Sequence, residues 1–128
     1  KGLGTEGGDV KVDPAPEKTA LEGVWEINCA PMGNQGAITA RIEIRGYIFD
    51  ISAKLYANTA CTQLMGEDSK KGTFTLPGAG QIDLKSNDGV VTLDIFGIEG
   101  DTLYLGADAA NEGERPTQLN KQLAYKRK

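Results

Sequence analysis

The sequence predicts an all-β domain, an antiparallel up-and-down β-barrel of about eight strands. The first observation is a strict alternation of apolar and polar residues over positions 37–57. The second is a series of short strand candidates separated by turns at intervals of roughly 8–12 residues. The third is that no segment shows a convincing apolar period of a helix. Sequential hairpins favour a closed barrel, because closure leaves no exposed strand edge.

The chain divides into a leader, residues 1–19, and a barrel domain, residues 20–128. The leader reads KGLGTEGGDVKVDPAPEKT and is rich in glycine, proline and charge. It has almost no apolar surface whose burial could offset the entropy lost on ordering. We expect a flexible segment, either a tether between a membrane anchor and the domain or a terminal remnant that frays.

Residues 37–57 are the clearest element and predict a tight antiparallel hairpin. Gly46 lies where the first alternating run gives way to the second, which suits a tight turn. A period of two places the apolar residues on one face and the polar residues on the other. The expected inward side chains are Ile38, Ala40, Ile42 and Ile44 of the first strand, and Tyr47, Phe49, Ile51, Ala53 and Leu55 of the second.

The segments on either side of this hairpin are less regular. Residues 21–29 form a strand candidate with Trp25, Ile27 and Cys29 on one face, and residues 30–36 are rich in turn formers. We expect residues 58–71 to continue the hairpin strand briefly and then to form a polar loop. A short helical turn is expected at Leu64 and Met65.

The pattern of short strands returns between Gly72 and the C-terminus. The Asp88-Gly89 pair suits a hairpin turn, residues 107–116 read as a loop, and residues 118–127 close the chain. In the strand over residues 90–98, Thr92 and Asp94 are expected to point outward. The inward side chains expected in this half are Phe74, Leu76, Ile82, Leu84, Val91, Leu93, Ile95, Leu103, Leu105, Leu119, Leu123 and Tyr125.

Composition and charge argue against several classes of function. The formal net charge is −4 with both signs interspersed, which gives no basic surface pattern for nucleic-acid binding. No apolar run approaches the roughly 20 residues that a membrane-spanning helix needs. The chain contains no histidine, and no nucleotide-binding or serine-nucleophile motif is present. We therefore expect no enzymatic activity, no metal site and no cofactor.

Two cysteines, Cys29 and Cys61, are present, and neither belongs to a metal-binding pair. In a meander the ends of the first and third strands lie at the same end of the barrel, so the chain beyond those ends could bring the two residues together. We expect a disulfide between them, which would place the domain in an oxidising compartment. The alternative is two buried, unreactive thiols of a cytosolic protein.

The motif Leu-x-Gly-x-Trp over residues 21–25, followed by an antiparallel meander, resembles the lipocalin and wider calycin family. The segments GVWEINC, GTFTLPG, GDTLYLG and RPTQL look like those of small lipocalin-like domains of secreted bacterial proteins and lipoproteins. The resemblance implies a buried Trp25 at one barrel end, next to Gly23 and under a basic side chain, Lys126 or Arg127. The chain lacks the Thr-Asp-x-x-Tyr step of the family, which puts a large ligand calyx in doubt.

This resemblance implies a non-enzymatic binding domain of the periplasm, the cell envelope or the secreted fraction. The ligand would be a small apolar molecule or a lipid at a barrel end with small residues such as Ala40, Ala53 and Ala57. The alternative is a monomeric protein-interaction domain, acting through its loops and leader like the periplasmic inhibitors of metalloproteases. Tyr56, Tyr104 and Arg115 are the expected contact residues; otherwise they are scattered surface tyrosines and a charged loop residue.

Overall fold

The computed structural model describes residues 19–33, 36–107 and 113–128, and confirms the all-β fold class. Eight antiparallel strands form a closed barrel in sequence order, with β8 returning to pair with β1. The predicted leader lies outside the described residues except for Thr19, which opens a short helical turn over residues 19–21. The strands are β1 Gly23–Pro31, β2 Ala37–Arg45, β3 Ile48–Tyr56, β4 Leu64–Thr75, β5 Gln81–Ser86, β6 Val91–Glu99, β7 Thr102–Leu105 and β8 Tyr125–Arg127.

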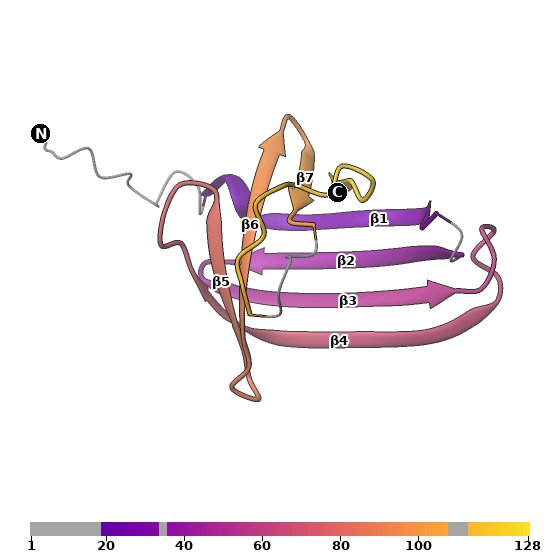
Figure 1. Ribbon diagram of the computed structural model, residues 1–128, viewed down its shortest axis with the longest axis horizontal. Helices are drawn as coiled ribbons and strands as arrows, with labels where there is room; N and C mark the ends of the chain where they lie inside the picture. Colours follow the sequence, from indigo (N-terminus) through magenta and orange to yellow (C-terminus); the bar gives the residue numbers. More distant parts are fainter. Residues whose placement is uncertain (1–18, 34–35, 108–112) are drawn as a thin grey trace, which may run out of the picture.

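The barrel is strongly asymmetric along its strands. Strands β1 to β4 lie side by side, and β5, β6 and β7 cross one end of them steeply (Figure 1). Strand β8 pairs with β1 only at Trp25 and Glu26, and β5 pairs with β4 only over residues 72–75. Beyond these pairings β1 to β4 continue as a sheet of their own, over residues 27–31, 37–41, 52–56 and 64–70, which we call the four-stranded end.

The core lies where the two sets of strands cross. The largest fully buried side chains are those of Trp25, Phe49, Leu21 and Leu103. Gly72 is placed at the bend of β4, where a Cβ atom would lie 1.9 Å from the carbonyl oxygen of Lys85. Only glycine allows β4 and β5 to approach this closely at this position. Gly72 therefore permits the pairing of β4 with β5 through which the sheet closes into a barrel.

The predicted hairpin of residues 37–57 is confirmed as β2 and β3, paired in unbroken register around Gly46. Gly46 has φ +62°, a left-handed conformation that suits glycine. The inward set of β2 is buried, as is Phe49 of β3. Tyr47 lies in the turn instead and is exposed, while Leu55 is 42 % exposed because it belongs to the four-stranded end.

Three sequence expectations about strand boundaries are wrong. The first strand begins at Gly23 rather than at position 21, since Leu21 belongs to the helical turn and packs into the core. The polar loop and helical turn expected within residues 58–71 are instead the first part of β4. This part is exposed on both faces, so its sequence carries no apolar alternation. The last strand is confined to β8, although the Gly106–Leu119 bridge ties the preceding segment to the end of β7.

The expected facing of β6 is also wrong. Val91 is 55 % exposed, whereas Phe96 is buried at 7 %. Asp94 is opposite the buried Ile82 in the ladder and therefore points inward with Phe96. The expectation is wrong because three apolar residues, Val91, Leu93 and Ile95, lie on the outward face of the strand. Among the described residues, no helix is long and apolar enough to cross a membrane.

Candidate functional site

Trp25 lies at the end of the barrel where β8 pairs with β1, which we call the closed end. Its indole is fully buried, and its Nε1–H donates a hydrogen bond of 2.8 Å to the carbonyl oxygen of Leu21. The Arg127 guanidinium lies 4.0 Å from the ring centroid, a cation–π contact. Of the two basic residues expected at this position, the structure selects Arg127, because Lys126 donates instead to the hydroxyl of Thr102 at 2.7 Å.

Arg127 also connects β8 to the segment that precedes β1. It donates to the carbonyl oxygens of Glu22 and Ala20 at 2.7 and 2.8 Å, and lies 3.7 Å from the carboxylate of Asp101. Gly23 makes room for it, since a Cβ atom there would lie 2.9 Å from Arg127 Nη1. These contacts fix the helical turn of residues 19–21 against β8, so the role of this cluster is structural.

A disulfide between Cys29 and Cys61 holds the opposite end, with a Cα–Cα distance of 5.9 Å. Cys29 has φ +54° and lies where the β1–β2 register shifts between Ile27 and Ala30, which makes it the centre of a bulge. The bulge turns the side chain toward the loop between β3 and β4, where Cys61 has φ +57°. The predicted bridge is therefore present, and it is consistent with an oxidising compartment.

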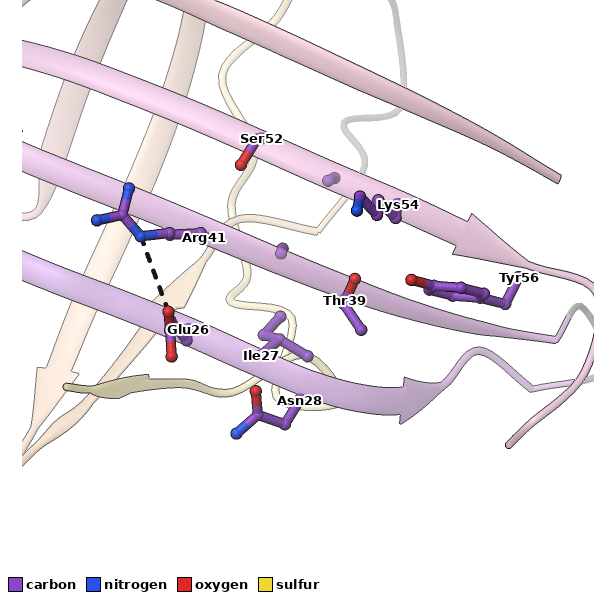
Figure 2. Close-up of a pocket in the computed structure, with 10 residues that line it drawn as sticks. Glu26, Ile27, Asn28, Thr39, Arg41, Ser52, Lys54 and Tyr56 are labelled. Carbon is purple, nitrogen blue, oxygen red and sulfur yellow. Dashed lines mark ion pairs between the residues drawn. The ribbon is translucent and has the colours of Figure 1, made fainter. Parts of the chain in front are cut away.

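A groove lies on the outer face of β1, β2 and β3, within and beside the four-stranded end. Its volume is about 220 Å³. Thr39, Lys54 and Tyr56 gather at one end of it, and Glu26 and Arg41 lie at the other (Figure 2). The lining residues are Glu26, Ile27 and Asn28 of β1, Thr39, Ala40 and Arg41 of β2, and Ser52, Ala53, Lys54 and Tyr56 of β3.

Alternation along the strands decides which side chains face this groove. Ile27, Ala40 and Ala53 are cross-strand neighbours on the inner face, so they contribute backbone to the floor. The small hydroxyl side chains of Thr39 and Ser52 leave the hollow between the longer ones. Of the three alanines expected to line a ligand site, Ala40 and Ala53 thus border the groove without turning their methyl groups into it. Ala57 lies beyond β3.

The charged groups of the groove are partly paired. Glu26 lies 3.8 Å from Arg41 and 3.7 Å from Lys128, so its carboxylate already faces two cations. Lys54 stands opposite Thr39 on β2 and opposite Glu67 on β4. The groove therefore offers hydroxyl, amide and ammonium groups for hydrogen bonding, and its lining carries one carboxylate and two cations.

The three expected contact residues do not form one site. Tyr56 lines the groove, but Tyr104 is on β7 with the Lys121 ammonium 4.3 Å from its ring centroid. Arg115 fastens its loop to the barrel by donating to Asp83 Oδ1 at 2.6 Å and to the carbonyl oxygen of Asp94 at 2.8 Å. In the described residues no contact joins the three, so only Tyr56 belongs to the groove.

Asp94, which was expected to point outward, carries a partly buried carboxyl group. Asp94 Oδ1 accepts hydrogen bonds from the N–H groups of Ile95 and Gly106 at 2.8 and 3.1 Å, which ties β6 to the end of β7. Burial raises the pKa of the Asp94 carboxyl, and those N–H groups and Arg115 only partly offset this effect. Burial, and then the charge of Asp94, raise the pKa of the Tyr125 phenol.

Asp94→Asn is expected to stabilise the protein at neutral pH. The pKa of Asp94 is raised in the folded protein, so folding favours the neutral carboxyl. The stability that the neutral carboxyl contributes is fully present below the ordinary aspartate pKa of about 4, and it is lost as the pH rises through the pKa of the folded protein. Asparagine retains the acceptor oxygen without the charge. Thermal unfolding from pH 4 to pH 8 should show a rising advantage of the variant with pH. An advantage that falls with pH would contradict the inward placement; Asp50→Asn, at a half-exposed site beside Lys71, is the control.

The described part of the chain has no group of three or more Cys, Asp or Glu side chains placed to hold a metal ion. Comparison of the chain with models of protein families, with curated proteins and with solved structures gives no match. The geometry therefore defines a fold class, which is a closed, eight-stranded, up-and-down antiparallel barrel with one disulfide.

Proposed function

We propose that the protein is a non-enzymatic binding domain and that the groove on β1, β2 and β3 holds a small polar ligand. The lining of this groove carries the proposal. The hydroxyl groups of Thr39 and Ser52 form its floor, with Tyr56 and Lys54 beside them. Such groups fix the orientation of a polar molecule by hydrogen bonds. Glu26, the carboxylate of the groove, is already paired with Arg41 and Lys128.

The proposal differs from the ligand expected of a lipocalin calyx. Trp25, Phe49 and Leu103, each almost fully buried, pack inside the barrel where such a ligand would lie. The lipocalin-like assignment itself remains part of the proposal, and it is supported by the up-and-down closure and by Gly23, Trp25 and Arg127 at the closed end. The polar groove lies outside this core, on the face that water reaches.

The proposed location is the periplasm, the cell envelope or the secreted fraction. It is supported by the disulfide, whose closed loop spans a sequence separation of 32 residues at the exposed end of the sheet. The leader, residues 1–19, is expected to be a tether to a lipid anchor. Residues 1–18 lie outside the described residues, so this role stays a prediction from composition.

Protein interaction is the second candidate function. The observation in its favour is an exposed apolar group at the end of β3 and the start of β4. Leu55, Leu64 and Met65 are 42 %, 53 % and 66 % exposed, near the loop that carries Cys61. Leu64 pairs with Tyr56, so Leu55 lies on the opposite face of the sheet, and Leu64 and Met65 form the exposed apolar pair; exposed apolar surface can mark an interaction site.

Thr39→Trp tests the groove, because a large side chain on the floor would fill it. Isothermal titration calorimetry with a panel of monosaccharides and free amino acids is the measurement. We expect at least one member to bind, and the variant to weaken that binding by about tenfold or more. Thr73→Trp, on exposed β4 outside the groove, is the matched control. Binding that survives Thr39→Trp in a folded variant would show that the ligand lies elsewhere.

A further inference from the structure

Strand β4 has a long free edge, distinct from the groove. Residues 64–70 pair with β3 on one side, while β5 begins to pair only at Gly72. In the described part of the chain no strand occupies the other side of residues 64–70. An unpaired edge of this length can template the addition of another strand.

The direction of the backbone groups along this edge follows from the ladder. The carbonyl oxygen of Lys71 accepts from Asn87 N–H at 2.8 Å, so the backbone groups of Lys71 point away from β3. In an antiparallel strand every second residue points to the same side, which places the N–H and C=O groups of Ser69 and Glu67 on the free edge. The N–H of Ser69 accordingly has only a local partner, the carboxylate of Asp68 at 2.9 Å.

A cleft of about 290 Å³ lies at the end of this edge. It forms where the turn after β5 leaves β4, and its lining residues are Ser69, Lys70, Lys71, Ser86, Asn87 and Asp88. It contains two ammonium groups against one carboxylate. The Asp88 carboxylate is already bonded by the Ser86 hydroxyl and by Val90 N–H, and Lys71 lies 3.8 Å from Asp50. The Ser86 hydroxyl and, to a smaller extent, the charge of Lys70 lower the pKa of the Asp88 carboxyl, but among the described residues Lys70 has no ion pair, so it supplies the cation most available to an anionic group from outside.

The opposite end of the edge is apolar. Leu64 and Met65 are both more than half exposed. Six residue steps separate Leu64 from Lys70, a length of about 20 Å in extended backbone. The edge thus offers apolar contact at its start, backbone groups along its length, and positive charge at its end.

We propose that the free edge of β4 binds an extended peptide that runs parallel to β4 and ends with its carboxyl-terminal carboxylate in the cleft at Lys70. The charge of the cleft fixes the direction, since the terminal carboxylate must lie beside the ammonium group. The peptide displaces the Asp68 carboxylate from Ser69 N–H and carries an apolar side chain near Leu64 and Met65. The partner is therefore a protein with an accessible, extended C-terminus.

The test uses the whole chain and two randomised, fluorescently labelled heptapeptide libraries, one with free carboxyl termini and one amidated. Fluorescence anisotropy should detect binding from the free-carboxyl library, and amidation of a selected peptide should weaken it by about tenfold or more. Lys70→Gln should weaken it similarly, while Lys85→Gln, at the exposed position of β5 and outside the cleft lining, should leave it unchanged. No binding from the free-carboxyl library, or equal binding of the amidated peptide, would overturn the proposal.

A proline substitution tests the strand addition separately. Ser69→Pro removes a backbone N–H from the free edge without removing a bond to β3, whereas Ser69→Ala keeps it. We expect Ser69→Pro to lose peptide binding and Ser69→Ala to retain it. Glu67→Pro removes an N–H from the same edge and replaces Ser69→Pro if that variant does not fold. Peptide binding that is unchanged in a folded proline variant would show that the peptide is not added to β4.

Discussion

Replacing Trp25 with alanine should lower the free energy of unfolding by about 3–5 kcal/mol. The indole is fully buried at the closed end, where it contacts the core, donates to Leu21 and lies under Arg127. Its removal leaves a cavity and an acceptor without its donor, and it uncouples the basic side chain from the ring. The loss should appear as a lower midpoint in chemical denaturation, measured by circular dichroism.

Trp25→Phe separates packing from the polar contacts of the indole. Phenylalanine retains an aromatic ring in the core but has no N–H for the carbonyl oxygen of Leu21, so a smaller loss is expected. Native fluorescence of the wild-type protein should be that of a buried tryptophan, inaccessible to quenchers. A red-shifted, quencher-accessible emission would contradict the closed end as described.

Removing the disulfide should cost about 3–4 kcal/mol, because the bridge closes a loop with a sequence separation of 32 residues and limits the unfolded chain. A double variant, Cys29→Asn with Cys61→Asn, is the preferred test. Both positions have positive φ, which asparagine adopts more easily than other non-glycine residues. A larger loss in the corresponding double alanine variant would measure the additional backbone strain.

The measurement is denaturant unfolding of the oxidised protein and of the double variant. The unfolded, unreduced protein should contain no free thiol, since Cys29 and Cys61 are both in the bridge. A count of two free thiols per chain, in protein made in an oxidising compartment, would contradict the bridge. It would also remove the support for an envelope or secreted location.

The fold could be predicted from the sequence in those strands that have one buried face and one face exposed to water. Strands β2 and β3 show this contrast, because Ile42 and Phe49 lie in the core while Arg41 and Lys54 face water. The register of the hairpin followed from the same alternation. The disulfide followed from the strand order.

The first part of β4, residues 64–71, was missed because it is held by backbone pairing rather than by burial. Its side chains are exposed on both faces, so its polar sequence resembles a loop. The facing of β6 was predicted wrongly because a charged residue occupies an inward position. A carboxylate, Asp94, occupies an inward position where it accepts two backbone N–H bonds, and this arrangement exists only once β7 is in place.

The site was predictable only in part. Tyr56 was expected at a contact surface and lines the groove, but the groove itself depends on the small size of Thr39 and Ser52 between longer neighbours on three strands. That arrangement requires the registers of β1, β2 and β3 together. Tyr104 and Arg115 are occupied by Lys121 and Asp83, partners far from them in sequence.

The central claim, that the binding surface is the polar outer groove, is tested most directly by mapping a ligand onto the backbone. Two-dimensional ¹H–¹⁵N NMR spectra would be recorded during titration with the polar panel and, separately, with a fatty acid. We predict that a polar ligand shifts the amide signals of Thr39, Ser52 and Lys54 and leaves those of Phe49 and Leu103 in place. Shifts confined to Phe49, Leu103 and other core residues, caused by the fatty acid alone, would contradict the claim and return the binding site to the barrel interior.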